Sequence, residues 1–355
     1  MAPWPARALP ALLAATLALA ACAGGGTTAE TPSGTSPTTV RLLAHDSFAL
    51  SEDLVTRLEQ EKGIRLEVIT GGDAVEVVNR AILSAGNPDA DVLFGVDNTL
   101  LPRAQTAGVF DPYTAPADGS LRPDLVASAD GAVTPIDDGD VCVNIDDRWF
   151  SAKGMDPPRT LEDLADPRYR DLLVVQNPAT SSPGLSFLLA TVGHFGDGWR
   201  DYWARLRANG VTVVNGWSEA YLGEFSGGGG EGTRPLVVSY STSPPAEIVY
   251  AADPKPARPS TSAMLDGCFH QVEYAGVLAG TPVPDAARAV VDWLASPEVQ
   301  ADIPLTMFVF PARSDVALPE VFEDFAPRPS SPQEPTGTTE EQAAWVDEWT
   351  EIVLR

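Results

Sequence analysis

Positive charge is scarce in this chain. Its 355 residues include 23 Lys and Arg against 49 Asp and Glu, which gives a formal net charge of −26 at pH 7. Nucleic-acid binding needs clustered cations that displace counterions from the phosphates, so nucleic acid is excluded as a partner. An acidic surface is compatible with a cationic small ligand, but it also serves solubility alone.

Long apolar runs are also scarce. The Ala/Leu-rich run 8–21 is about 14 residues, shorter than the roughly 20 that span a bilayer. It follows Arg7, ends at Leu19-Ala20-Ala21-Cys22 and precedes a spacer of small and polar residues. This order is typical of an export signal with its cleavage site, so we expect residues 1–21 to be a signal peptide. A buried core helix with a chance cysteine is the alternative.

The junction at Cys22 resembles a bacterial lipobox. The resemblance implies that Cys22 is acylated, that 22–39 is a flexible tether, and that the protein is anchored by lipid on the extracytoplasmic face, periplasmic or at the cell surface. Cys142 and Cys268 then remain as an even pair outside the cytoplasm, which favours a disulfide. No second apolar run is long enough to span a membrane, so we expect the lipid to be the only membrane contact.

Short apolar runs alternate with amphipathic segments after residue 39, which predicts an α/β fold with a parallel sheet covered by helices. About 330 residues after the leader exceed one compact core, so we expect two lobes. The expected strands are 39–44, 64–70, 90–96, 172–176, 211–214, 236–240, 269–275 and 306–310. The expected helices are 51–61, 74–84, 161–165, 182–192, 199–206, 285–295 and a last helix from Thr338.

No metal or cofactor site is expected. The Gly-rich segment 226–234 neither follows a strand nor opens a helix, so it is interpreted as a loop and not as a phosphate cradle. The acidic run 137–140 suggests calcium, but a solvated turn entering a hinge is favoured. His194 and His270 lack metal-ligand spacing, and structural roles are favoured for both.

Polar and aromatic side chains follow six of the predicted strands. Open α/β sheets bind ligands beyond the carboxyl ends of their strands. Any one of these segments is explained as a helix N-cap, but six at equivalent positions predict a rim around one cleft. The segments are 46–48, 71–74, 97–98, 180–184, 216–219 and 240–244.

These segments resemble the thiamine-binding proteins of bacterial ABC importers. The resemblance runs from residue 39 to the end of the chain, and it rests on Asp46-Ser47-Phe48, Gly95-Val96-Asp97-Asn98, Thr180-Ser181-Ser182-Pro183-Gly184-Leu185, Gly216-Trp217-Ser218-Glu219-Ala220-Tyr221, Ser239-Tyr240-Ser241-Thr242-Ser243-Pro244 and Gln271-Val272-Glu273. It implies a two-lobed type II periplasmic-binding-protein fold, each lobe a mixed sheet flanked by helices, joined by hinge crossovers. The expected boundaries are 40–139 for the first lobe, 140–270 for the second, and 271–355 returning to the first lobe with the C-terminal helix.

The resemblance also implies the ligand-binding residues. Trp217 and Tyr240 would stack on the thiamine rings, and a desolvated cation–π contact contributes on the order of 2 kcal/mol. Asp73 would bind the cation or the exocyclic amine, and the Ser/Thr turns the hydroxyl or a phosphate. At the positions of His45, Phe308 and Ala246, related proteins carry aromatic residues that differ from the residues of this chain. Tyr250 would supply the ring that is missing at Ala246. The full set is His45, Asp73, Ala74, Ser181, Ser182, Trp217, Tyr240, Ser241, Thr242, Ser243, Pro244 and Phe308.

The leading prediction is a monomeric, non-catalytic receptor that captures thiamine or thiamine phosphates and delivers them to a permease. One alternative is a receptor for another cationic solute, such as a polyamine. Another is a thiaminase-like enzyme with Cys142 as nucleophile, but the neighbouring aspartates would raise the pKa of its thiol, and a disulfide to Cys268 would block it. Tyr221 is expected in the core.

Overall fold

The computed structural model describes residues 36–355, apart from the side chain of Ala127. In this part of the chain, ten strands form one mixed sheet in the order β2-β1-β3-β9-β5-β8-β6-β7, with β4 added to β9 and β10 to β5. The strands are β1 Thr38–Ala44, β2 Ile64–Thr70, β3 Val92–Asp97, β4 Phe110–Asp111, β5 Thr134–Asp146, β6 Leu173–Gln176, β7 Thr212–Val214, β8 Leu236–Tyr240, β9 Thr261–Leu278 and β10 Phe310–Pro311.

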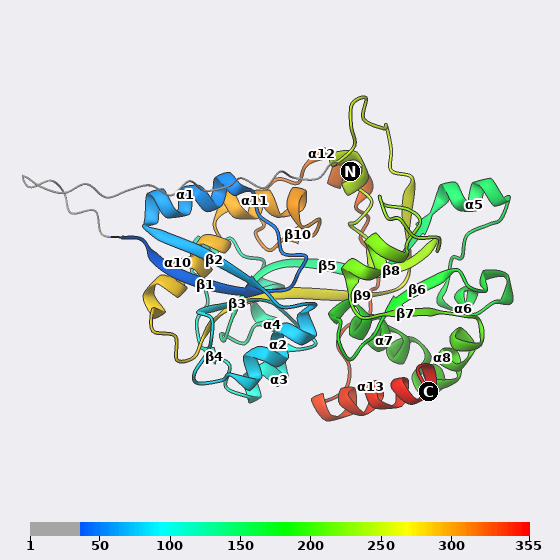
Figure 1. Cartoon of the computed structure of the whole chain (residues 1–355), viewed down its shortest axis with the longest axis horizontal. Coiled ribbons are helices and arrows are strands. Elements are labelled where there is room, and N and C mark those ends of the chain that lie inside the picture. The colour runs from blue at the N-terminus through cyan, green and yellow to red at the C-terminus, as the bar shows by residue number, and fades with distance from the viewer. Residues whose placement is uncertain (1–35) are drawn as a thin grey trace, which may run out of the picture. The chain divides into compact units, whose positions relative to one another are not determined.

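The long strands β5 and β9 run antiparallel through the middle of the sheet (Figure 1). At one end they pair with β3, β4 and β10, and β1 and β2 extend the sheet from β3; we call this the first half. At the other end β5 pairs with β8, which is followed by β6 and β7; we call this the second half. The predicted α/β class is therefore confirmed, and β5 and β9 are the segments that connect the two halves.

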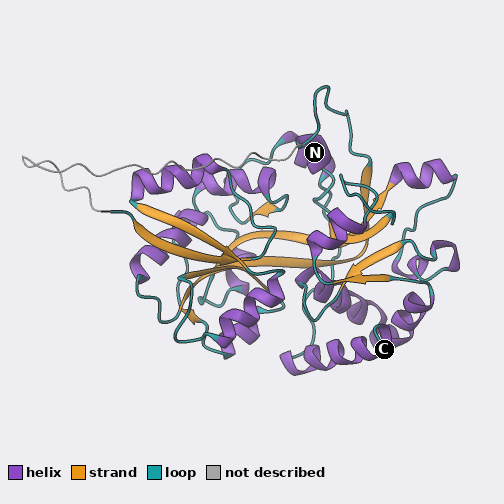
Figure 2. Ribbon diagram, viewed as in Figure 1, coloured by secondary structure: helices purple, strands orange, loops and turns teal. Residues whose placement is uncertain are grey.

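Helices flank the sheet (Figure 2). In the first half α1 packs on β2, α2 on β1 and β3, and α10 on β1, β3 and β9. In the second half α7 packs on β5, β6, β8 and β9. The α-helices are α1 Glu52–Lys62, α2 Ala74–Leu83, α3 Leu101–Thr106, α4 Pro123–Ser128, α5 Asp147–Lys153, α6 Leu161–Leu164, α7 Ser182–Phe195, α8 Trp199–Ala208, α9 Ala246–Val249, α10 Pro284–Leu294, α11 Pro297–Thr306, α12 Glu320–Phe325 and α13 Thr339–Val353. Short 3-10 turns occupy Ala117–Gly119, Pro167–Tyr169 and Gly196–Gly198, and a π-helix occupies Glu219–Glu224.

The predicted turn at 137–140 is wrong. Asp137, Asp138 and Asp140 lie inside β5, and each is at most 1% exposed. Cations compensate two of them, because Arg328 Nη1 lies 2.7 Å from Asp138 and His270 Nδ1 lies 3.3 Å from Asp140. Charged residues in a strand are therefore buried here by tertiary ion pairs, which a polarity pattern does not reveal.

The predicted strand 306–310 is also wrong. Residues up to Thr306 belong to α11, and Phe308 has a φ of 56°, which no strand allows. Only Phe310 and Pro311 pair with β5.

The C-terminal helix differs from the expected lobe assignment. It begins at the predicted capping box of Thr338 and Glu341. However, α13 packs on α7 and α8 of the second half, with the ring of Trp349 5.4 Å from that of Trp203. The reason is the burial of Trp349 against this helix pair, which removes a large apolar side chain from water. The helix α13 therefore packs on the second half and does not return to the first. The other predicted lobe boundaries stay a prediction.

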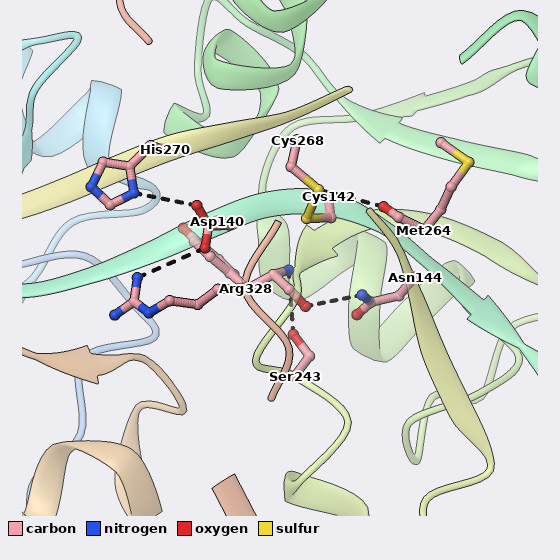
Figure 3. Close-up of a disulfide and its surroundings, with 9 residues drawn as sticks. Asp140, Cys142, Asn144, Ser243, Met264, Cys268, His270 and Arg328 are labelled. Carbon is pink, nitrogen blue, oxygen red and sulfur yellow. Dashed lines mark hydrogen bonds and ion pairs between the residues drawn. A yellow bond between two sulfur atoms is a disulfide. The ribbon is translucent and has the colours of Figure 1, made fainter. Parts of the chain in front are cut away.

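The predicted disulfide between Cys142 and Cys268 is confirmed, with 4.5 Å between the two Cα atoms. It joins β5 to β9 where the register shifts: Val141 opposes Phe269, and Val143 opposes Met264. Figure 3 shows the bridge and, further along β5, Asp140 between His270 and Arg328. The disulfide therefore ties together the two strands that connect the halves.

Among residues 36–355, no helix has the length and apolar character needed to cross a membrane. The predicted signal peptide and Cys22 lie outside the described residues.

Candidate ligand-binding site

A cavity of about 300 Å³ lies between residues of the two halves. This volume falls at the lower end of the range for small-molecule sites. The first half contributes His45, Asp46, Ser47, Glu273, Thr306, Met307, Phe308 and Val309. The second half contributes Trp217, Ser218, Tyr221, Leu222, Gly228, Tyr240, Ser243, Ala246 and Tyr250. The cavity therefore combines aromatic rings with carboxylates.

Two aromatic pairs stand at the cavity. Trp217 stacks on Tyr221, with ring centroids 4.9 Å apart and an interplanar angle of 13°. Its indole Nε1–H donates to Ser239 Oγ over 2.8 Å, so the ring is held in one orientation. Tyr250 meets Phe308 edge to face with centroids 5.4 Å apart, and Tyr250 is 70% exposed. One pair is therefore fixed by the protein, while the other lies at the solvent side.

A chain of hydrogen bonds holds Tyr240. Its hydroxyl donates to Gln271 Oε1 over 2.7 Å, and Gln271 Nε2 donates to Asp97 Oδ2 over 2.5 Å and to Ser182 Oγ over 3.2 Å. Burial, with nearby carboxylates, raises the pKa of Tyr240 well above its usual value. Burial also raises the pKa of Asp97 to about 6, although the hydrogen bonds that its carboxylate accepts from Thr99 and Gln271 lower this pKa. Tyr240 therefore stays a neutral phenol.

His45 and Glu273 face each other on the first half, with 3.5 Å between Nε2 and Oε1. Burial lowers the pKa of His45, but the charge and hydrogen bond of Glu273, together with Asp73 and Asp46, outweigh it, and the pKa lies above its usual value. Close to Glu273, burial and the adjacent carboxylates raise the pKa of Asp137 well above its usual value. Glu273, which lines the cavity, therefore lies in a cluster of acidic residues.

Asp73, the N-cap of α2, joins the two halves. Its Oδ1 accepts the backbone N–H of Ala74 (2.7 Å) and of Ser182 (3.0 Å), and its Oδ2 accepts that of Trp217 (3.0 Å). Burial raises the pKa of Asp73, while the bonds from Ser182, Trp217 and Ser181 lower it.

The structure brings only part of the predicted set to the cavity. His45, Trp217, Tyr240, Ser243 and Phe308 line it, and Tyr250 lines it beside Ala246. The other predicted residues do not line the cavity and are buried: Asp73, Ala74, Ser181, Ser182, Ser241, Thr242 and Pro244. Tyr221, expected in the core, is 3% exposed and also contributes to the wall.

Glu273 was not among the predicted site residues. It lies within β9 and not after the end of a strand, so the search of strand ends overlooks it. The available signal is a lone acidic residue in the otherwise apolar run after Gln271. A charge in such a run indicates either an ion pair or a binding role, and here it has both a histidine partner and cavity exposure.

Relatives of this chain were found by sequence and by structure. A thiamine-binding periplasmic protein of Salmonella typhimurium (strain LT2) is 31% identical over 322 residues, which cover 88% of this chain and 92% of the relative. A thiamine-binding periplasmic protein of Escherichia coli K12 is 31% identical over 299 residues, covering 84% and 86%. A solved periplasmic thiamin binding protein superposes with a TM-score of 0.75 at 28% identity, covering 90% of this chain and 97% of the other.

A protein-family model, described as bacterial extracellular solute-binding protein, matches residues 87–329 of this chain. These residues include β5 and β9, which connect the halves, and most of the cavity wall. The chain therefore belongs to the family of bacterial extracellular solute-binding proteins.

Proposed function

We propose that this protein is the substrate-binding component of an ABC importer, binds thiamine between its two halves and delivers it to the permease. The observation that carries the proposal is a cavity lined by both aromatic rings and carboxylates. The relatives named thiamine-binding proteins, which match across more than four fifths of the chain, support the same ligand.

The cavity chemistry suits thiamine. Its thiazolium is a permanent cation, and its aminopyrimidine is a flat ring with an exocyclic amine. The face of Trp217 offers stacking, and a cation over a desolvated aromatic face gains about 2 kcal/mol. Glu273 and Asp46 offer carboxylates for the positive charge or for the amine.

Calorimetry with the purified protein tests the ligand. Thiamine is titrated first, followed by thiamine monophosphate, thiamine diphosphate and spermidine. We expect saturable heat with thiamine and none with spermidine. Heat with spermidine alone would identify a polyamine receptor, and no heat with any thiamine form would refute the proposal.

We further infer a binding role without catalysis. The thiaminase-like alternative needs a free thiolate at Cys142, but this sulfur is bonded to Cys268. Titration of thiols in the unfolded, non-reduced protein should detect neither of these two cysteines. A freely alkylatable Cys142 would restore the enzyme hypothesis.

We also propose export and lipid anchoring at Cys22, with residues 1–21 removed and the chain acting as a monomer. The support is the lipobox-like junction in the sequence and the family's extracellular description. A tether of about 17 residues would reach roughly 20–25 Å, enough to reorient above a permease. In a bacterial host, the native chain should partition with membranes and incorporate labelled fatty acid, whereas Cys22→Ser should do neither. Equal labelling of both would contradict the anchor.

A further inference from the structure

We propose that a second cavity, between α3 of the first half and α13 of the second, binds a small oxyanion or carboxylate through Arg103. This cavity has a volume of about 200 Å³ and shares no lining residue with the cavity to which we assign thiamine. We call it the α3–α13 cavity. It is a separate site, and its ligand is of opposite charge to thiamine.

Both halves form the walls of the α3–α13 cavity. The first half contributes residues of α2 and α3, Arg103 among them. The second half contributes Pro178 and Leu185 around the start of α7, and the first turns of α13 from Thr339 to Asp347. Figure 1 shows these turns of α13 beside α2 and α3. A ligand bound here would therefore contact the two halves at once.

Arg103 is an unpaired cation in this wall. Its Nε and Nη2 are buried and have no hydrogen-bond partner among residues 36–355. Arg122 and Arg288 also bury Nε without a partner, but each pairs through Nη2 with an aspartate, at 2.7 Å and 2.8 Å. Burying a charged group without a partner is costly, so an anion that accepts the Nε–H and Nη2–H groups would be stabilised.

Asp97, the carboxylate whose charge acts on Arg103, is occupied by other donors. Its Oδ1 accepts the N–H of Thr99 and of Leu100, each over 2.9 Å, and its Oδ2 accepts Gln271 Nε2 over 2.5 Å. Burial lowers the pKa of the Arg103 guanidinium, and the charge of Asp97 offsets this only in part. Asp97 therefore does not supply the acceptor that Arg103 lacks.

The chemistry of the wall defines the class of ligand. The Nε and one Nη of a guanidinium present two parallel N–H groups, which match two oxygens of a carboxylate or a phosphate. Thr339 and Gln342 add polar groups to the wall. Asp347 is the one carboxylate among the described residues that line this cavity, and its exposure on α13 lets water and salt screen it. The small volume restricts the ligand to a small anion.

Hydrogen bonds connect the α3–α13 cavity with the other one. The hydroxyl of Thr99, which lines the α3–α13 cavity, donates to Asp97 Oδ1 over 2.7 Å. Asp97 Oδ2 accepts from Gln271, and Gln271 Oε1 accepts from the Tyr240 hydroxyl at the thiamine cavity. Each cavity also needs walls from both halves, so the anion and thiamine favour the same arrangement. If the proposed function holds, each ligand therefore strengthens binding of the other.

Calorimetry with the purified protein tests the site. Inorganic phosphate and acetate are titrated separately at neutral pH and constant ionic strength, without thiamine. We expect saturable heat with at least one of them; phosphate alone would indicate an oxyanion ligand, and acetate alone a carboxylate. Heat with neither would overturn the inference.

Variants of the wall locate the anion. Arg103→Gln removes the cation and should abolish the heat. Arg65→Gln is the matched control, because this exposed arginine pairs with Glu59 outside the cavity and should bind the anion like the native protein. Asp347→Asn removes a like charge at an exposed position, so it should fold, and it should tighten anion binding by roughly threefold. Native-like binding by both Arg103→Gln and Asp347→Asn would overturn the inference.

The last measurement is thiamine affinity with and without the saturating anion. The dissociation constant of thiamine should fall roughly fivefold in the native protein and stay unchanged in Arg103→Gln. Weaker thiamine binding in the presence of the anion would place the anion in the thiamine cavity and overturn the inference. Binding of the anion without binding of any thiamine form would refute the proposed function and leave the α3–α13 site standing.

Discussion

The acidic residues around Glu273 are held side by side by strand register. Asp97 on β3 and Asp137 on β5 both oppose Glu273 on β9. Like charges directly opposite each other destabilise a sheet, and burial adds to this cost. Neither oxygen of Asp137 has a hydrogen-bond partner among the described residues. Such an arrangement favours the protonated form of the Asp97 and Asp137 carboxyl groups, in agreement with their raised pKa values.

The raised pKa of Asp97 predicts a pH-dependent stability. The pKa is about 6 in the folded protein and about 3.8 without the fold, so the stabilising contribution is present below the lower value and is lost as pH rises through the higher one. Relative to the native protein, Asp97→Asn should therefore gain roughly 2 kcal/mol of unfolding free energy between pH 4 and pH 7. Urea denaturation at both pH values measures this change.

The quantity to compare is how the difference in unfolding free energy between Asp97→Asn and the native protein changes with pH. A single pH is not enough, because Asn also alters the hydrogen bonds to Thr99 and Gln271 at every pH. Asp285→Asn, which removes an exposed carboxylate, is the control for loss of one acidic side chain. A difference between Asp97→Asn and the native protein that is the same at both pH values would contradict the prediction.

Trp217 is the aromatic residue whose loss should weaken thiamine binding most. Trp217→Ala removes the stacking face and should cost about 2 kcal/mol, or roughly thirtyfold in affinity. Trp217→Phe keeps an aromatic face and should cost less. Calorimetry measures both, and Trp149→Ala on α5, outside the cavity, is the control. The prediction fails if Trp217→Ala binds thiamine like the native protein.

At the scale of elements, β5 and β9 decide how the halves are connected. They pair along most of their length, and the register shift at Val141–Val143 leaves residues 265–268 of β9 opposite Cys142 alone. Within this bulge Gly267 has a φ of 67°, and a Cβ there would meet Leu161 at 2.3 Å. Asp266 Oδ2 accepts the N–H of Leu161 at the start of α6. The bulge thus anchors a helix of the second half.

Removing the disulfide should destabilise the protein by about 2–5 kcal/mol, because it closes a loop of more than a hundred residues. Cys142→Ala, Cys268→Ala and the double variant are compared by urea denaturation. Each single substitution breaks the same disulfide, so each should lower the free energy of unfolding by about as much as the double variant does. Strictly additive single effects would show that the bridge is not what stabilises the fold.

The sequence predicts individual elements best where the local pattern is complete. β1, β2 and β8 begin or end within one residue of their predicted bounds, because alternating or continuous apolar residues and nearby turns define them. β5 has no such pattern, since four of its residues between Asp137 and Asp146 are acidic. Its place in the sheet depends on cations from distant segments, such as Arg328 and His270.

At the scale of the whole molecule, the cavity draws its wall from both halves, so a bound ligand links them. Thiamine at about 100 times its dissociation constant should therefore add about 2.7 kcal/mol to the free energy of unfolding. Urea denaturation with and without ligand measures the gain. Spermidine should add nothing, and Trp217→Ala at the same thiamine concentration should gain much less. An equal gain in the native protein and in Trp217→Ala would place the ligand elsewhere.

The sequence by itself determined the α/β class, most helices, the Cys142–Cys268 pair and the family resemblance. These depend on local periodicity, on cysteine count and on short motifs. Only the tertiary structure decided the roles of the acidic residues: Asp73 binds backbone N–H groups of the opposite half instead of lining the cavity, and Glu273 lines it from within a strand. The reason is physical. A carboxylate acts according to the donors and charges brought to it by segments distant in the chain, and a one-dimensional pattern does not contain those neighbours.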